Sequence, residues 1–163
     1  MVILGIDPGI GRLGWGFIEI QNSKFKVQNF GCIETDKKLT LEKRIQQIYE
    51  EVRELIKIHK PEVLAIEELF FGTNVTTAFT VGQARGVVLL AASQADMPIY
   101  TYSPQAVKIA VTGYGRADKK QVGEMVKVLL NLKVVPKLDD TADALAIALT
   151  HAFSYKLKQA SIK

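Results

Sequence analysis

Short apolar runs bounded by turn residues mark five stretches of the chain as buried strands. Pro8-Gly9 ends the first run, and the polar residues 21–24 separate the second from the third as a hairpin turn. Runs of this length and composition predict strands that bury most of their side chains. The predicted strands cover residues 2–7, 14–20, 26–35, the run VLAIEE at 63–68, and 98–102.

Between and after these strands, apolar residues recur at helical spacing. The clearest case is an amphipathic pattern in which Leu41, Ile45 and Ile48 fall on one face. Ser103-Pro104 predicts a helix start with a capping serine, and Asp118 with Gln121 three residues later resembles a capping box. The predicted helices cover residues 40–59, 74–95, a stretch beginning at 104, 118–131, and 139–155.

The order of elements is three strands, helix, strand, helix, strand and three helices, which predicts a mixed five-stranded sheet flanked by helices. We therefore expect one α/β domain over residues 1–155 and a basic, frayed tail over 156–163. With 48% hydrophobic and 23% charged residues in 163, the composition is that of a globular protein. No apolar run is long enough to span a membrane, and no signal peptide is expected at the N-terminus. Cys32 is the only cysteine, which suits a reducing cytoplasm.

The positive charge is concentrated in one quarter of the chain. Residues 104–137 carry seven basic and two acidic side chains, a net charge of +5, whereas the whole chain has +4. Such a segment is either a solvated helical face or a surface that binds a polyanion such as nucleic acid. Charge alone does not decide between these two interpretations.

The stretch GIDPGIGRLGWG at residues 5–16 contains the spacing GxGxxG, formed by Gly9, Gly11 and Gly14. A dinucleotide-binding loop of this type must open a helix, but the residues that follow have an extended pattern. The stretch also resembles the phosphate-binding hairpin of the actin–sugar-kinase ATPases, which need two lobes and hence a longer chain. What remains is Asp7 at the carboxyl end of a buried strand.

Further carboxylates occur where they are costly to bury without a partner. Glu67 and Glu68 end an apolar strand, and because neighbouring strand residues point to opposite faces, only one of them can share a site with Asp7. Asp140 and Asp143 lie three apart at the start of an apolar helix and therefore on one face of it. Asp139 is a candidate for the helix N-cap, and stabilisation of a helix dipole is the structural explanation for all three aspartates.

Clustered carboxylates raise one another's pKa unless a cation neutralises them. Oxygen ligands without a His or Cys cluster favour a hard ion, Mg²⁺ or Mn²⁺. Two such ions about 3.5–4 Å apart are widely used for in-line hydrolysis of phosphodiesters. With the basic segment, these residues predict a metal-dependent nuclease.

Several motifs together resemble the RuvC family of Holliday-junction resolvases. In order along residues 2–151 they are LGIDPG, AIEELFF, VGQARGV, QAVK followed by VTGYGRADKKQV, and DDTADALAIALTH. The resemblance implies an RNase H-like nuclease domain, a homodimer, and Mg²⁺-dependent nicking of four-way DNA junctions with Mn²⁺ as a substitute and two ions per site. It also implies symmetric paired nicks that leave 5′-phosphate and 3′-hydroxyl ends, in DNA recombination and repair. A branch-migration motor complex is the implied partner besides DNA.

Carried over by motif, the resemblance places the catalytic metal ligands at Asp7, Glu67, Asp140 and Asp143. Glu68 and Asp139 stay open as rivals because the chain has acidic doublets at both places. The same comparison implies DNA-binding roles for Lys108, Lys119 and Phe70. On this interpretation, Gly9, Gly11 and Gly14 shape a hairpin that lets the DNA backbone approach Asp7. A ribonuclease or pre-rRNA-processing nuclease, a small ATP-binding domain and a non-catalytic DNA-binding module are the alternatives.

The segment from Thr76 to Ala95 is apolar on more than one face, so we expect it to pack against a second copy of the chain as well as the sheet. Gly82 and Gly86 are four apart and would allow another helix to approach closely. A two-fold dimer also suits the two-fold symmetry of a four-way junction. Val88→Arg is accordingly expected to give a folded monomer.

Overall fold

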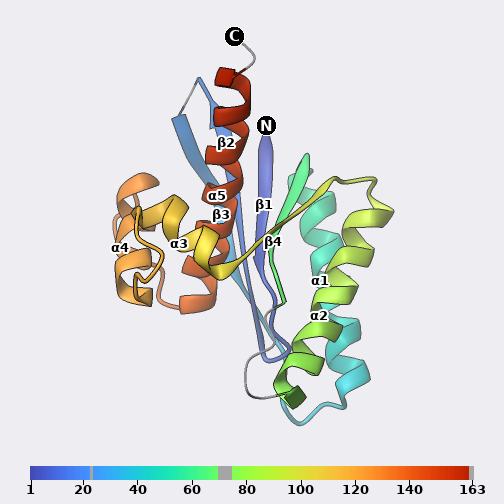
Figure 1. Ribbon diagram of the computed structural model, residues 1–163. Coiled ribbons are helices and arrows are strands. Elements are labelled where there is room, and N and C mark those ends of the chain that lie inside the picture. Colours follow the sequence, from blue (N-terminus) through green and yellow to red (C-terminus); the bar gives the residue numbers. More distant parts are fainter. Residues whose placement is uncertain (23, 70–74, 162–163) are drawn as a thin grey trace.

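The computed structural model describes residues 1–22, 24–69 and 75–161, which form one mixed sheet with helices on both faces (Figure 1). The strand order across the sheet is β3-β2-β1-β4-β5. β1, β2 and β3 are antiparallel neighbours, whereas β4 and β5 run parallel to β1. The strands are β1 (Val2–Asp7), β2 (Arg12–Gln21), β3 (Lys24–Glu34), β4 (Val63–Glu67) and β5 (Ile99–Tyr102).

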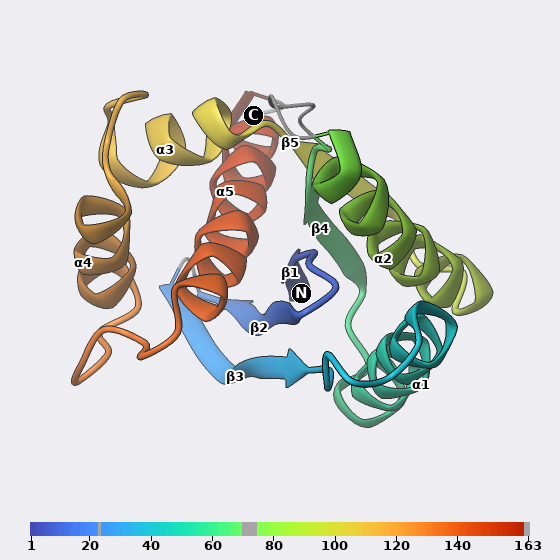
Figure 2. The same cartoon turned by 90° about the horizontal axis from the view of Figure 1, so that it is seen from below.

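Two helices cover one face of the sheet and three lie on the other, as Figure 2 shows in a view from below. The helices are α1 (Leu41–His59), α2 (Val75–Gln94), α3 (Pro104–Thr112), α4 (Lys119–Leu129) and α5 (Asp139–Ser161). α1 and α2 pack together on one side, and α5 lies directly on the other with α3 and α4 outside it. The order of strands and helices predicted from the sequence is therefore confirmed.

Alternation along β1 and β4 distributes their side chains between two separate cores. Leu4, Ile6 and Ile66 pack under α1 and α2. Ile3 and Ala65, on the opposite face, pack under α5. Both strands are therefore apolar throughout, which is why they appear as continuous apolar runs in the sequence.

Glycines in β1 and β2 allow α5 to lie unusually close to the sheet. A Cβ on Gly14 would lie 1.9 Å from the backbone oxygen of Asp140, and a Cβ on Gly5 would lie 2.2 Å from that of Ala144. Gly16, two residues after Gly14 on β2, has the same function, because a Cβ there would lie 2.5 Å from Cδ2 of Leu145. Any larger residue at these positions would push the helix away from the strands.

The predicted helix starts are largely confirmed. Ser103 accepts a hydrogen bond from the backbone nitrogen of Ala106, and Asp118 forms both bonds of a capping box with Gln121. Two boundaries of the last helix differ from the prediction. Asp139 is the first helical residue rather than the N-cap, and α5 continues to Ser161 instead of ending near residue 155, so helix occupies most of the segment expected to be frayed.

No helix in the described ranges is long and apolar enough to cross a membrane.

We predict that Gly14→Ala lowers the free energy of unfolding by about 1–3 kcal/mol, because the added methyl group overlaps the α5 backbone. Gly11→Ala is the matched control in the same hairpin, since a Cβ there would lie 3.5 Å from the Arg44 guanidinium, an ordinary contact. That variant should stay within about 0.5 kcal/mol of the wild type. Urea unfolding followed by circular dichroism measures both values. Equal stability of the two variants would show that α5 does not depend on close contact with Gly14.

Candidate active site

Two carboxylates end neighbouring parallel strands on the face that α5 covers. Asp7 is the last residue of β1 and Glu67 the last of β4, and the two strands pair in register up to Ile6 and Ile66. Because Ile6 and Ile66 face α1 and α2, the residues that follow them face α5. Asp7 and Glu67 are both half-buried, whereas Glu68 is exposed. Glu67 rather than Glu68 therefore shares a face with Asp7.

The first turns of α5 bring two more carboxylates to the same edge of the sheet. Asp140 and Asp143 are half-buried, whereas Asp139 is exposed. Gly14 lets the backbone at Asp140 lie against β2, and the Thr141 hydroxyl donates a 3.2 Å hydrogen bond to the Gly31 carbonyl of β3. The start of α5 is thus fixed to two strands of the hairpin.

Burial and mutual repulsion shift the pKa values of the carboxylates at this edge of the sheet. Burial, together with the negative charges of Glu67, Asp143 and Asp140, raises the pKa of Asp7 from 3.8 to about 7, although Lys119 opposes the shift. Burial and Asp143 also raise the pKa of Glu67 above its ordinary value, against the influence of Lys119 and Lys108. The cluster therefore carries more negative charge than its surroundings neutralise.

Asp140 and Asp143 each have a basic partner from another element. Lys119 Nζ, at the start of α4, lies 3.3 Å from Asp143 Oδ2. Arg12 Nη1, at the start of β2, lies 3.7 Å from Asp140 Oδ2. Burial would lower the pKa of Lys119, but the charge and hydrogen bond of Asp143, with Asp139 and Asp7, outweigh it and raise that pKa. Lys119 is thus a firmly charged ammonium group beside the acidic cluster.

The four carboxylates have the chemistry of a magnesium site but are not yet arranged as one. Among residues 1–22, 24–69 and 75–161, no three acidic, histidine or cysteine side chains converge closely enough to hold a metal ion. The pairing of Asp140 with Arg12 and of Asp143 with Lys119 explains part of this, because both carboxylates are directed to a cation of the protein itself. All of the candidate ligands are oxygen atoms, which suit a hard ion.

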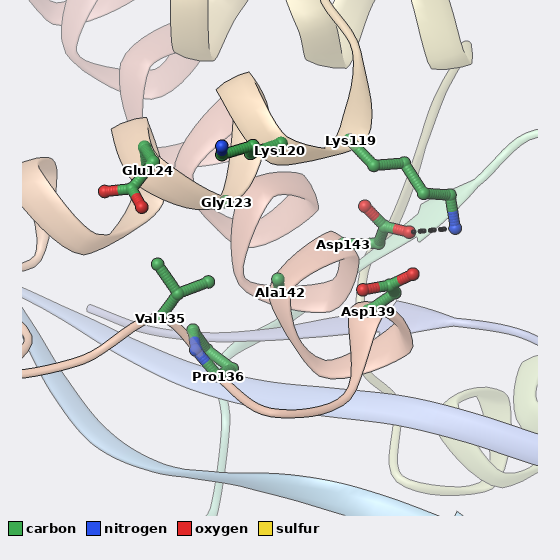
Figure 3. Close-up of a pocket in the computed structure, with 9 residues that line it drawn as sticks. All are labelled: Lys119, Lys120, Gly123, Glu124, Val135, Pro136, Asp139, Ala142 and Asp143. Atoms are coloured by element: carbon green, nitrogen blue, oxygen red, sulfur yellow. Dashed lines mark hydrogen bonds and ion pairs between the residues drawn. The ribbon is translucent and has the colours of Figure 1, made fainter.

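A hollow of about 450 Å³ between α4 and α5 opens beside the cluster (Figure 3). In Figure 3, Lys119 extends from α4 toward Asp143, and Asp139 lies next to Asp143 on the same helix. Asp139 therefore borders the hollow. Its charge raises the pKa of Asp143, whereas the carboxylates that raise the pKa of Asp7, besides burial, are Glu67, Asp143 and Asp140. Charged and apolar residues line it together: Lys119, Lys120, Gly123, Glu124, Val135, Pro136, Asp139, Ala142 and Asp143.

The remaining candidates differ in where they lie. Lys108 is half-buried on α3 and near enough to Glu67 to lower its pKa, so both candidate lysines adjoin the cluster. Phe70 lies outside the described residues. The close approach expected at Gly14 exists, but it admits α5 rather than DNA. Gly9 fits a tight turn, since a Cβ there would lie 2.2 Å from the Arg12 oxygen.

Sequence reasoning missed Arg12 as the partner of Asp140. Arg12 lies within the glycine-rich stretch of residues 5–16. Its ion pair with Asp140 joins residues more than a hundred positions apart in the sequence. Its position at the start of β2, directly after a turn that follows Asp7, was the available signal. A basic residue there lies at the same sheet edge as the predicted carboxylates.

Comparison with known proteins supports the same family as the motifs in the sequence. The family model described as "Crossover junction endodeoxyribonuclease RuvC" matches residues 3–151. RuvC from Alkaliphilus metalliredigens is 54% identical over 154 residues, which is 94% of either chain. The structure of Thermus thermophilus RuvC matches at 40% identity with a TM-score of 0.89, covering 97% of each chain. The Thermus thermophilus protein in complex with a Holliday junction substrate gives a TM-score of 0.91, covering 97% of this chain and 96% of that one.

The raised pKa of Asp7 leads to a prediction for the protein in EDTA. A carboxyl whose folded-state pKa is about 7 binds its proton more tightly in the folded than in the unfolded chain. Its contribution to stability is therefore complete below about pH 4 and is lost as the pH rises to about 7. Asp7→Asn should remove this loss and be more stable than the wild type at pH 8 by on the order of a few kcal/mol.

Denaturant unfolding at pH 5, 6, 7 and 8 measures this difference. Glu68→Gln is the control, because it removes an exposed carboxylate from the adjoining strand end. It should keep the wild-type dependence on pH. A constant stability difference between Asp7→Asn and the wild type across this range would contradict the assignment of a strongly raised pKa to Asp7.

Proposed function

The chain belongs to the RuvC family of crossover junction endodeoxyribonucleases, and we propose that it resolves four-way DNA junctions with Asp7, Glu67, Asp140 and Asp143 as metal ligands. Membership makes it a nuclease of DNA recombination and repair, and this agrees with the mixed α/β fold. It does not favour the ribonuclease alternative. The observation that supports the site is the meeting of four half-buried carboxylates at the ends of β1 and β4 and the start of α5.

Mg²⁺, with Mn²⁺ as a substitute, fits the donor set, and we propose two ions per site. When bound, such ions generate a hydroxide nucleophile and stabilise the charge that develops on the phosphate oxygens. Burial and the neighbouring carboxylates together raise the pKa of Asp7, and a divalent cation would neutralise the negative charge that they share. Asp140 and Asp143 must then exchange Arg12 and Lys119 for the cation.

The protein's own residues orient the DNA strand. Lys119 and Lys108 lie beside the carboxylates, on the basic segment, and we propose that they bind the phosphates that flank the scissile bond. Lys119 would then bind a phosphate instead of Asp143. Its ammonium group would neutralise Asp143 in the free protein and the phosphate in the complex with DNA. Phe70, two residues beyond Glu68, is proposed to stack on an unpaired base at the junction. Attack of water on phosphorus, in line with and opposite to the 3′-oxygen, would break the P–O3′ bond and leave 5′-phosphate and 3′-hydroxyl ends.

We further propose that two copies of the chain assemble through the outer face of α2. Phe79, Gln83, Gly86 and Leu90, here called the seam, are all exposed and follow one another at spacings of four, three and four residues. That spacing is typical of helices packing against each other, and a Cβ on Gly86 would meet nothing within 4 Å. A two-fold dimer presents two equivalent sites to a two-fold substrate, as paired symmetric nicks require.

The expectation for Val88 is wrong. Val88 has no exposed surface and packs in the core between the sheet, α1 and α2, together with Ala84 and Ala92. An arginine there would bury an unpaired charge within the subunit and unfold it, rather than give a folded monomer. The residue that faces outward is Leu90, which is 49% exposed.

We propose that the protein acts in the cytoplasm, whose reducing environment suits its single cysteine, Cys32. The branch-migration motor complex stays a prediction from the family resemblance.

The metal-site proposal predicts unequal effects at the two adjacent glutamates. Glu67→Gln, like Asp7→Asn, should lower cleavage of a four-way junction by more than about 100-fold, because replacing a ligand costs more than replacing its supporting partner. Glu68→Gln should retain activity, since its side chain is on the exposed side of the strand end.

Cleavage of junctions with one labelled strand at a time, in Mg²⁺, measures activity, symmetry and position of the nicks. Binding is measured in Ca²⁺ and should change little in any of the three variants. Linear duplex and an RNA–DNA hybrid are the control substrates. Loss of activity in Glu68→Gln but not in Glu67→Gln would overturn the site.

The seam predicts that Leu90→Arg gives a folded monomer that no longer makes paired nicks. Two-fold symmetry introduces the charge twice into one interface, so the dimer dissociation constant should rise by at least about 100-fold. Sedimentation equilibrium distinguishes the 18.0 kDa chain from a species of twice that mass. Ile58→Arg, on α1 and 67% exposed, is the control and should leave the mass unchanged. A wild-type monomer that still makes paired nicks would refute the dimer.

A further inference from the structure

One residue of the VGQARGV motif contacts the strand end that carries Glu67. Arg85, on α2, donates from Nε to the backbone oxygen of Glu67 at 3.2 Å and from Nη2 to Thr101 Oγ1 at 3.2 Å. Its guanidinium group thus joins the end of β4 to β5. Neither contact involves the Glu67 carboxylate, which faces α5 on the other side of the sheet.

The end of β4 is paired with only one of its two neighbouring strands. Pairing between β4 and β1 stops at Ile66, whereas pairing with β5 continues to Glu67 and Tyr102. Glu68 adds one more bond, from its backbone nitrogen to the Tyr102 oxygen. Glu67 is therefore held by the ladder on one side only. Arg85 supplies a second attachment to the backbone of the same residue.

α2 also contacts the next residues along the chain. A Cβ on Gly82, one turn before Arg85, would lie 3.5 Å from Cδ2 of Leu69. The helix therefore touches this strand end at both Glu67 and Leu69. A guanidinium group is suited to fixing a backbone oxygen because its donors form a rigid planar fork.

We propose that Arg85 is a positioning residue for Glu67: it fixes the backbone at the end of β4, and through it the direction of the Glu67 carboxylate. This rests on the proposed function of Glu67 as a metal ligand. Groups that orient a ligand without touching the metal commonly change metal affinity by 10- to 100-fold when they are replaced. Because Arg85 adjoins Gly86 of the seam, the same contact links the proposed dimer helix to the site.

Arg85→Met is the principal variant, because it keeps the aliphatic stem and removes every donor. We expect the Mn²⁺ dissociation constant of the free protein, measured by titration calorimetry, to rise about 10-fold. The turnover rate at saturating junction should fall by a similar factor. The junction dissociation constant in Ca²⁺ should stay within about twofold of the wild type. Arg85→Lys keeps one donor group and should recover part of both losses.

A double-mutant cycle separates positioning from other functions. If Arg85 acts through Glu67, Arg85→Met should change Mn²⁺ affinity little when Glu67 is already glutamine. Equal changes in the presence and absence of Glu67 would overturn the proposal, as would a weakened, more salt-sensitive junction affinity with unchanged turnover. A lower melting temperature with wild-type Mn²⁺ affinity would also overturn it, since Arg85 would then only join α2 to the sheet.

Thr101→Val provides a second measurement should Arg85→Met not fold. It removes one of the two acceptors with little change in shape and leaves the bond to Glu67, so its effect on Mn²⁺ affinity should be smaller and in the same direction. Wild-type cleavage and its loss in Asp7→Asn are measured alongside. If these controls fail, the proposed function is wrong; if they hold and Mn²⁺ affinity is unchanged in both variants, only the inference about Arg85 is wrong.

Discussion

The close approach of α5 to the first hairpin determines where the carboxylates of the proposed site lie relative to one another. Carboxylates on a helix and on a strand lie near each other only if the two backbones do, and side chains of ordinary size between a helix and a sheet prevent this. Gly5, Gly14 and Gly16 remove those side chains along the line where α5 crosses β1 and β2. The glycine-rich opening of the sequence thus serves a helix that begins more than a hundred residues later. Nothing in it requires a bound nucleotide.

This placement has an electrostatic cost that the fold only partly offsets. Burial and mutual repulsion raise the pKa of Asp7, Glu67 and Asp143, while Arg12 and Lys119 each compensate one carboxylate of α5. The side chains of Arg12 and Lys119 are 53% and 68% exposed, so a phosphate group could reach either of them from solvent. The divalent cation proposed for this site would relieve that repulsion. Without that cation, ionisation of Asp7 is expected to lower the stability of the protein as the pH rises to about 7.

The strands, the helices and their order could be predicted from the sequence because each depends on local patterns. Apolar runs, the capping box at Asp118 and the capping serine at Ser103 are short-range signals. The alternation of side chains along β4 was sufficient to show that only one of Glu67 and Glu68 shares a site with Asp7, although not which. The choice needed the neighbouring core, in which Ile66 faces α1 and α2. The end of α5 was misplaced because the sequence of its last turn, KQAS at residues 158–161, has no apolar stripe to mark a helix.

Contacts between segments far apart in the sequence could not be predicted, because they depend on how the helices and the sheet pack against one another. Val88 and Leu90 are both apolar residues of one apolar helix, and only the position of the sheet distinguishes the buried one from the exposed one. The same holds for Arg12 and Arg85, whose partners lie on other elements.

α2 shows why such contacts concern function as well as packing. Its inner face completes the core beneath β4, its outer seam is free for a second subunit, and Arg85 lies between the two with its guanidinium group on the strand that ends in Glu67. A helix with three such surfaces cannot shift at one without changing the others. In the proposed dimer, the spacing of the two sites and the geometry within each site would therefore depend on the same twenty residues.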